Sequence, residues 1–327
     1  MEYRNFGKDH IRISEVGLGC WQIGGNWSRV DESDALAILR TAVEHGITFL
    51  DTANVYGAGR SEQIIGRFLK EACSAEIFVA TKVGRGEMYP ENYTERGIRE
   101  DVEASLSRLG VDALDLVQTH CVPSGIMRSG EIFEWLETMV GEGKIKRIGA
   151  SVETDDEANL LLENLDTLYS LQMIFNVFRQ KPIETVFDKA KAKKVGIIAR
   201  VPLASGVLSG KFNKDTAFEE TDHRNFNRDG AAFNVGETFA GVPFEKGVEF
   251  AQAIEKIKPD TLSLSEMALR WILDHEAVSV VIPGASRTEQ AADNARVSQL
   301  PRLSDEVHEK LKALYQEKIA RSIRGAY

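Results

Sequence analysis

Short apolar runs alternate along the chain with longer segments in which apolar residues recur at helical spacing. Eight runs are typical of buried strands: Glu15–Gly19, Thr48–Asp51, Ile77–Thr81, Leu114–Gln118, Arg147–Ser151, Ser170–Phe175, Gly196–Arg200 and Val278–Ile282. Strands that alternate with helices favour parallel pairing through crossover helices, and a closed barrel accommodates eight of them. We therefore predict an α/β fold, a (β/α)8 TIM barrel formed as a single domain over residues 1–327.

The segments between these runs carry the apolar stripe of amphipathic helices. The first, Asp34 to Glu44, is followed by Gly46 as a C-terminal cap, and its stripe consists of Ala35, Ile38, Leu39 and Ala42. A second, Ile98 to Leu109, ends before Gly110, and its expected buried face consists of Ile98, Val102, Ser105, Leu106 and Leu109.

A doubly wound open sheet is the alternative architecture. It would need a Gly-x-Gly-x-x-Gly turn after its first strand, and the nearest candidate, Gly17-Leu18-Gly19-Cys20-Trp21-Gln22, lacks the third glycine. Polar residues also follow or end several runs, where a barrel would bring them to one face: Asp51, Lys82, His120, Ser151 and Gln172. Both observations favour the barrel.

Charge and cysteine content narrow the function classes. The chain has 40 basic and 50 acidic side chains, a net charge of −10, which argues against a nucleic-acid partner. The start of the chain has no apolar leader segment, and no stretch is long and apolar enough to span a membrane. The spacing of Cys20, Cys73 and Cys121 suggests neither a disulfide framework nor a metal site. We expect a cytoplasmic protein that has no membrane partner; the sequence does not indicate an oligomeric state.

Four side chains near the ends of three successive strands suit carbonyl reduction: Asp51, Tyr56, Lys82 and His120. A tyrosine with a pKa near 10 is a weak proton donor unless a neighbouring cation stabilises its anion, a role that Lys82 can fill while Asp51 keeps Lys82 charged. His120 can orient the carbonyl oxygen. Singly, each residue also has a structural explanation, as a cap, a packing group or a solvated charge. Lys82 could instead form a Schiff base in a lyase or aldolase.

From about Tyr3 to about Leu314 the sequence resembles the aldo-keto reductases. The motifs that carry the resemblance are Phe49 to Gly57 (FLDTANVYG) with Ser61-Glu62 and Gly66, Ala80 to Gly84 (ATKVG), and Leu114 to His120 (LDLVQTH). The resemblance implies a barrel with an N-terminal β-hairpin and a long loop between strands 7 and 8. It also implies NADP(H)-dependent reduction of an aldehyde or ketone, such as a sugar or keto-sugar, with Asp51, Tyr56, Lys82 and His120 as the catalytic set.

The same resemblance implies contacts to the cofactor. Ser151 and Gln172 would hold the nicotinamide carboxamide, Pro202 to Lys211 would cover the pyrophosphate, and Ile282 to Asn294 would hold the adenosine phosphate. The expected contact residues are Trp21, Asp51, Ser151, Gln172, Arg200, Pro202, Leu203, Ser205, Leu208, Lys211, Gly284, Ser286, Arg287, Gln290 and Asn294. Arg287 can grip a 2′-phosphate bidentately, which predicts a preference for NADPH over NADH. In the alternative, Ser286 caps a helix from Arg287 to Arg296 and Arg287 faces solvent.

Three positions depart from the family pattern. Val152 replaces an asparagine that many relatives use on the carboxamide, Arg200 replaces an aromatic ring beside the nicotinamide, and Cys121-Val122-Pro123 replaces a bulky aromatic after His120. A planar guanidinium at position 200 can stack where the ring would lie.

Substrate choice should depend on Trp21, Val55, Cys121 and the stretch from Phe212 to Gly247. That stretch either folds over the site as a lid or packs its own aromatics on the barrel rim, and the two roles are compatible. Some barrels of this family are channel-associated subunits that hold the cofactor and turn over slowly. A slow regulatory subunit is therefore an alternative to a rapid enzyme.

Overall fold

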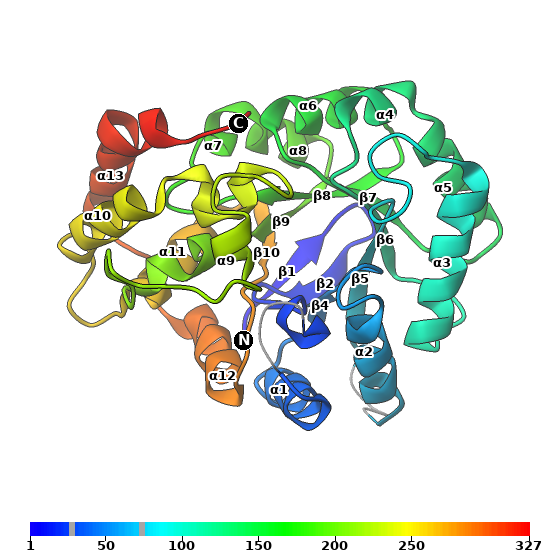
Figure 1. Ribbon diagram of the computed structural model, residues 1–327, viewed down its shortest axis with the longest axis horizontal. Coiled ribbons are helices and arrows are strands. Elements are labelled where there is room, and N and C mark those ends of the chain that lie inside the picture. The colour runs from blue at the N-terminus through cyan, green and yellow to red at the C-terminus, as the bar shows by residue number, and fades with distance from the viewer. Residues whose placement is uncertain (26–29, 72–75) are drawn as a thin grey trace.

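The computed structural model describes residues 1–25, 30–71 and 76–327, so Cys73 lies outside the described residues. Eight parallel strands follow chain order around the sheet: β3 (Leu18–Gly19), β4 (Phe49–Asp51), β5 (Phe78–Val83), β6 (Leu116–His120), β7 (Ile148–Ser151), β8 (Leu168–Ile174), β9 (Gly196–Arg200) and β10 (Val278–Val281). Backbone hydrogen bonds close the sheet, because Gly17 N donates to Val281 O at 2.8 Å and Val281 N donates to Glu15 O at 3.0 Å. The predicted closed barrel is confirmed (Figure 1).

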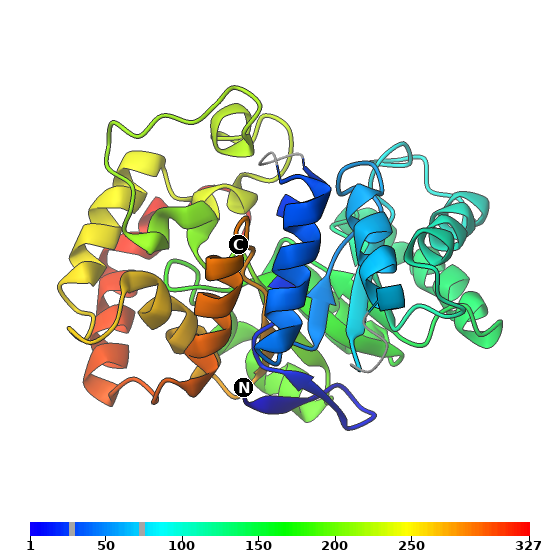
Figure 2. The ribbon, with the colours of Figure 1, turned by 90° about the horizontal axis from the view of Figure 1, so that it is seen from below.

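An antiparallel hairpin, β1 (Tyr3–Phe6) and β2 (Ile11–Ser14), covers one end of the barrel. Phe6 packs edge-on against three rings of the barrel interior, Phe49, Phe78 and Tyr169, at centroid distances of 5.6, 5.5 and 5.3 Å. In Figure 2 the hairpin lies at the opposite end from the segment that follows β9. The apolar layer around Phe6 therefore fills the lower end of the barrel.

The helices flanking the first seven barrel strands are α1 (Glu32–Glu44), α2 (Arg60–Glu71), α3 (Glu95–Leu109), α4 (Ser124–Ser129), α5 (Glu131–Gly141), α6 (Asp155–Asn164), α7 (Pro182–Thr185) and α8 (Phe187–Ala192). The two predicted helices correspond to α1 and α3, which begin after side-chain caps from Asp31 and Thr94. The predicted apolar stripes are buried, except that Leu106 is half-buried. Residue Gly110 ends α3 in the left-handed conformation, which favours glycine.

The long connection between β9 and β10 contains η2 (Ala204–Ser209), α9 (His223–Phe226), η3 (Val235–Glu237), η4 (Phe239–Gly241), α10 (Phe244–Glu255) and α11 (Leu264–Leu273). Several of its aromatics pack on one another: the Phe212 ring lies 5.3 Å from Phe218, and Phe239 lies 4.9 Å from Phe244. We call residues 222–241 the wall segment, because four of its side chains face the cavity described below: His223, Arg224, Phe233 and Glu237.

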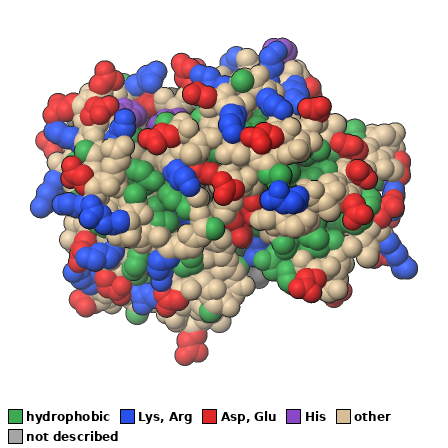
Figure 3. Space-filling model, turned by 90° about the horizontal axis from the view of Figure 1, so that it is seen from above, with side chains coloured by type: hydrophobic (Ala, Val, Ile, Leu, Met, Phe, Trp, Pro, Cys, Tyr) green, Lys and Arg blue, Asp and Glu red, His purple; other side chains and the backbone are tan. Residues whose placement is uncertain are grey.

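The chain then continues through α12 (Thr288–Arg296), η5 (Val297–Gln299), α13 (Asp305–Leu314), a π-helical turn η6 (Tyr315–Ile319) and η7 (Ala320–Ser322). On the outer face seen in Figure 3, acidic and basic side chains intermingle, with apolar side chains in the gaps between them. Within the described ranges, none of the helices combines the length and apolarity that a membrane crossing requires.

Candidate active site

A cavity of about 740 Å³ opens at the carboxyl ends of the strands, a volume usual for small-molecule and cofactor sites. It is lined by most of the residues singled out from the sequence: Trp21, Asp51, Tyr56, His120, Ser151, Gln172, Arg200, Pro202, Leu203, Ser205, Lys211, Gly284, Ser286, Arg287 and Gln290. Three others do not line it. Lys82 is buried and contacts Tyr56 and Asp51, Leu208 is buried in the hydrophobic core, and Asn294 is buried and donates to Gly284 O at 3.3 Å.

The ammonium of Lys82 is the centre of a buried polar unit. Its Nζ donates to Asp51 Oδ2 at 2.7 Å, to the backbone carbonyl of Thr52 at 2.8 Å, and to Tyr56 Oη at 3.1 Å. These contacts use the three protons of an ammonium, so Lys82 is charged and fixed. The sequence-derived strands ended before Lys82 and His120, whereas β5 and β6 include them, which gives both side chains a rigid origin.

Burial and charge act in opposite directions on this unit. Burial alone would lower the pKa of Lys82, but Asp51 and Tyr56 raise it above its ordinary value. For Tyr56, burial raises the pKa and outweighs the lowering by Lys82. The expected stabilisation of the tyrosinate by Lys82 is present, but it does not bring the pKa of Tyr56 below its ordinary value. Tyr56 is protonated at neutral pH, and Lys82 favours the anion left when that proton departs.

His120 projects from the end of β6 beside Tyr56, with the two rings edge to face at 5.7 Å. Burial lowers the pKa of His120 well below its ordinary value, and the cations Lys82, Arg85 and Arg200 add to the shift. The imidazole is therefore neutral at physiological pH. Its Nδ1 is buried without a hydrogen-bond partner among the described residues, and a neutral imidazole can donate through one nitrogen.

Gln172 and Ser151 lie on neighbouring strands close to this unit. Gln172 Nε2 donates to Asp51 Oδ1 at 2.7 Å, so this amide nitrogen orients the aspartate. Ser151 Oγ lies 3.4 Å from the Cys121 Sγ. Both residues line the cavity, which is compatible with the expected contacts to a carboxamide.

The far end of the cavity carries positive charge. Arg287 and Lys211 are exposed, line the cavity and lie near the start of α12 and the end of η2. The N-cap of α12 is Arg287, and Ser286 instead uses its Oγ and its backbone N–H to contact Gln290 Oε1 at 3.1 and 2.8 Å. The alternative in which Ser286 caps this helix is therefore wrong. Gln22, which the sequence did not single out, packs against Gly284, where a Cβ would lie 2.1 Å from its Nε2.

Comparisons with known proteins agree on one protein family. The model of the aldo/keto reductase family matches residues 15–316. Over 303 residues the chain is 31% identical to aldo-keto reductase YhdN of Bacillus subtilis (strain 168), with 89% of this chain and 86% of that protein covered. The chain belongs to the aldo/keto reductase family. It is an oxidoreductase of that family.

Solved structures agree in fold over nearly the whole chain. The aldo-keto reductase AKR11C1 from Bacillus halodurans, in its holo form, matches with a TM-score of 0.77 and 26% identity, covering 100% of this chain and 98% of that one. The glycerol dehydrogenase AKR11B4 from Gluconobacter oxydans matches with a TM-score of 0.75 and 29% identity, covering 99% and 97%. The chain therefore shares its overall fold with both of these solved enzymes.

Arg200 in this aldo/keto reductase is held away from solvent by three groups. Its Nη1 forms an ion pair with Glu237 of the wall segment, and its Nη2 donates to Val152 O at 2.8 Å and contacts Cys121 Sγ at 3.7 Å. Burial lowers the pKa of Arg200, but Glu237, with smaller contributions from Cys121 and Glu153, raises the pKa above its ordinary value. The guanidinium is therefore anchored between the barrel and the wall segment.

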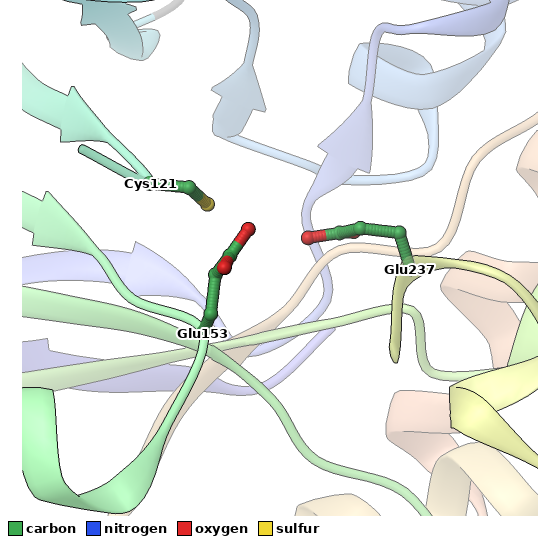
Figure 4. Close-up of side chains that lie close together, drawn as sticks. All are labelled: Cys121, Glu153 and Glu237. Carbon is green, nitrogen blue, oxygen red and sulfur yellow. The ribbon is translucent and has the colours of Figure 1, made fainter. Parts of the chain in front are cut away.

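A cluster of Cys121, Glu153 and Glu237 lies at this side of the reductase site, with its potential ligand atoms within 4.8 Å of one another. Figure 4 shows Glu237 reaching toward the other two from the opposite side. Two guanidinium groups balance the cluster, since Arg200 pairs with Glu237 and Arg85 lies 4.0 Å from Glu153. Burial raises the pKa of the Cys121 thiol to about 11, which leaves the thiol protonated at neutral pH.

Several site residues of the enzyme were not assigned an individual role in the site from the sequence. Arg85, Phe233 and Glu237 line the cavity, as does His223, whose ring lies 5.0 Å from Trp21. Arg85 directly follows the ATKVG motif, so its position beyond the end of β5 was a usable signal. The other three belong to the wall segment, whose sequence has no periodic pattern that would show which residues face inward.

Proposed function

We propose that this enzyme reduces an aldehyde or ketone to an alcohol with NADPH, and that Tyr56 donates the proton. The observation that carries the proposal is the partly buried hydrogen bond from Lys82 Nζ to Tyr56 Oη at 3.1 Å, together with the buried ion pair of the same ammonium with Asp51. Such a unit has a proton to give and a fixed positive charge beside the anion that remains.

The cavity suits a dinucleotide. One end contains Tyr56 and His120, the other contains Arg287 and Lys211, and the residues between include buried polar groups such as Gln172. Two buried polar atoms near the catalytic end, His120 Nδ1 and Gln118 Nε2, have no hydrogen-bond partner among the described residues. When bound, the nicotinamide would supply the hydride. Ser151 and Gln172 would hold its carboxamide, and Arg287 with Lys211 would bind phosphate oxygens.

The protein's own groups account for the proton and for the developing charge. Tyr56 Oη passes its proton to the carbonyl oxygen, and Lys82 stabilises the resulting tyrosinate. Asp51 keeps Lys82 charged and in place. Neutral His120 orients the carbonyl oxygen by donating a hydrogen bond, which stabilises the negative charge that grows there.

We also propose that NADPH is preferred over NADH, because Arg287 is an exposed guanidinium on the cavity and has no side-chain partner within the described parts of the chain. A free guanidinium can grip a 2′-phosphate with two parallel hydrogen bonds. The free, buried thiols of Cys20 and Cys121 suit a reducing compartment, so we propose that the reaction takes place in the cytoplasm.

For the substrate we propose a small carbonyl compound with hydroxyl groups, in the range of sugars and keto-sugars. The catalytic end of the cavity combines the ring of Trp21 with the polar groups Arg85 and Glu237. An aromatic face beside charged hydrogen-bonding groups suits a polyhydroxylated molecule. The likeness to a glycerol dehydrogenase supports the same substrate class.

The test is an NADPH oxidation assay with the purified protein against sugars, keto-sugars, short aldehydes and aromatic aldehydes. Tyr56→Phe should lower kcat by about 10²- to 10⁴-fold and leave NADPH affinity within about twofold, since the hydroxyl acts on the carbonyl. A normal rate in Tyr56→Phe would contradict the mechanism.

Trapping of substrate on Lys82 by borohydride without nicotinamide would instead support a Schiff-base lyase. Tight NADP binding without turnover would support a regulatory subunit.

A further inference from the structure

The final residues of the sequence, 323–327, cross the outer side of the wall segment. In Figure 1 the end of the chain, drawn in red, runs from α13 toward α7. Arg324 makes the contacts that join the two segments. Its backbone N–H and its Nε both donate to Gly241 O, at 3.0 and 3.1 Å, while Nη1 pairs with Asp229 at 2.5 Å and Nη2 donates to Arg228 O at 2.9 Å. A single side chain thus connects both ends of residues 228–241.

Tyr327 forms a second attachment, on the body of the barrel. Its hydroxyl accepts from Lys181 N at 2.9 Å and lies 2.6 Å from the Tyr315 hydroxyl. Its ring lies against the Arg179 guanidinium, 4.3 Å from centroid to Cζ. These contacts fix residues 323–327 to the start of α7 and to η6.

Arg179 connects this attachment to the wall segment from inside. The side chain is buried, and its Nε donates to Ala240 O at 3.0 Å. It also packs directly under Gly236, where a Cβ would lie 2.3 Å from Nη2. Arg179 therefore contacts both η3 and η4, and the ring of Tyr327 covers it.

Glu237, the residue that follows Gly236 in η3, contacts the active site. Glu237 pairs with Arg200, whose Nη2 holds Val152 O at 2.8 Å beside the cavity. Ser205 adds a further tie, since its Oγ donates to Glu237 O at 3.2 Å and accepts from Phe239 N at 3.1 Å. Displacing η3 and η4 would therefore separate Glu237 from Arg200 and change the shape of the cavity.

The wall segment is also strained where it is held. Phe239 and Ala240 have φ of 55° and 57°, in the left-handed region that non-glycine residues rarely adopt. Strain of this kind persists only where surrounding contacts enforce it. Arg324 and Arg179 bond the backbone carbonyls of Gly241 and Ala240, directly at the strained turn.

We propose that residues 323–327 are a latch that holds the wall segment closed against the active site, with Arg324 and Tyr327 as its positioning residues. Neither lines the cavity, so both act through Arg179, Gly241 and the Glu237–Arg200 pair. The catalytic consequence rests on the proposed reductase function. The mechanical part does not, because it concerns contacts within the chain.

The test compares Arg324→Ala with Arg321→Ala. Arg321 is the same residue type three positions earlier, is exposed, and donates to Glu317 O within its own helical turn. Hydrogen exchange of the unliganded protein, followed by mass spectrometry, should be about tenfold faster in residues 228–241 of Arg324→Ala, with the barrel strands unchanged. Arg321→Ala should match the wild type. Unchanged exchange, or an equal increase in both variants, would overturn the latch.

Kinetics provide the second readout. In Arg324→Ala the KM for the carbonyl substrate should rise about tenfold and kcat should change less, because the catalytic unit is intact while the cavity wall is loosened. Arg324→Lys, which keeps the charge facing Asp229 but loses the forked contacts, should show only part of the loss seen in Arg324→Ala.

Tyr327→Phe, which keeps the ring over Arg179, is the mild variant if Arg324→Ala folds poorly, and it should raise exchange in the same residues. An unchanged KM together with faster exchange would refute the positioning role. Absence of turnover in the wild type would refute the reductase proposal while the exchange result still decides the latch.

Discussion

Gln172 Nε2 donates to Asp51 Oδ1 at 2.7 Å, from a strand four positions around the barrel from the one that ends in Asp51. The other oxygen of the same carboxylate accepts from Lys82. Asp51 is thus held from two sides across the interior of the barrel, and its orientation, which sets the position of the Lys82 ammonium, does not depend on the loops.

Asp51→Asn tests this arrangement. Without the carboxylate, burial is left to lower the pKa of Lys82, so the alkaline limit of activity should move to lower pH. Breaking a buried pair should also cost about 3–5 kcal/mol of stability at pH 7. The measurements are a pH–rate profile and urea unfolding. An unshifted alkaline limb would show that Asp51 does not control the charge of Lys82.

The same linkage predicts how the wild type responds to alkali. Because the folded pKa of Lys82 lies above its unfolded value, its contribution to stability is present below the unfolded pKa and is lost as pH rises through the folded pKa. The free energy of unfolding of the wild type, measured in urea, should therefore fall at high pH. This fall in the free energy of unfolding with rising pH should be smaller in Asp51→Asn, whose Lys82 no longer has a raised pKa.

His120 should remain neutral through the physiological range. Its folded pKa is depressed, so its contribution to stability is present above the unfolded pKa, about 6.5, and is lost as pH falls toward the folded value. NMR of histidine labelled at Cε1, assigned with a His120→Asn variant, should show no titration of His120 near pH 6.5. A midpoint there would contradict the lowered pKa of His120 and would mean that its imidazole is protonated in a substantial fraction of molecules just below neutral pH.

Removing the negative partner of Arg200 should be more harmful than removing both partners. In Glu237→Gln the guanidinium remains buried without its carboxylate, which should cost about 3–5 kcal/mol. The double variant Arg200→Met, Glu237→Leu should recover much of that loss. Urea unfolding of Arg200→Met, Glu237→Leu and the variant that combines them gives the coupling energy. If the single and double variants lost the same stability, Arg200 would not depend on Glu237.

Cofactor choice is tested at the other end of the cavity. Arg287→Ala should raise the KM for NADPH about tenfold and leave the KM for NADH unchanged, since the lost contact is to the 2′-phosphate alone. The KM for NADPH of Arg287→Lys should lie between those of the wild type and Arg287→Ala. An unchanged ratio of the two KM values would mean that Arg287 does not read this phosphate.

The barrel could be predicted from the sequence because its strands, and helices such as α1 and α3, have local patterns of apolar residues. The runs at β3 to β10 are apolar and short, and the stripes of α1 and α3 recur at helical spacing. The catalytic candidates were predictable for a related reason: Asp51, Lys82 and His120 occupy equivalent places at strand ends, and parallel strands bring such places together.

Other features depend on contacts that no local pattern encodes. Glu237 meets Arg200 from 37 residues away, out of a segment without periodicity, so neither residue signals the other. The raised pKa of Tyr56 depends on how completely its hydroxyl is buried, which the sequence does not specify. Ser286 looked like a helix cap by residue type, but Gln290 reaches back to its hydroxyl and its N–H, and the helix begins one residue later.

The apolar layer around Phe6 also restricts how the enzyme regains its acid form. Below the level of Asp51, the rings of Phe6, Phe49, Phe78 and Tyr169 form an apolar layer on the hairpin side of the described barrel. In the proposed mechanism, the tyrosinate left at position 56 after each turnover is therefore reprotonated from the open mouth of the cavity. The rate of that return should depend on solvent access past the bound ligands, and slowing in D₂O would report it.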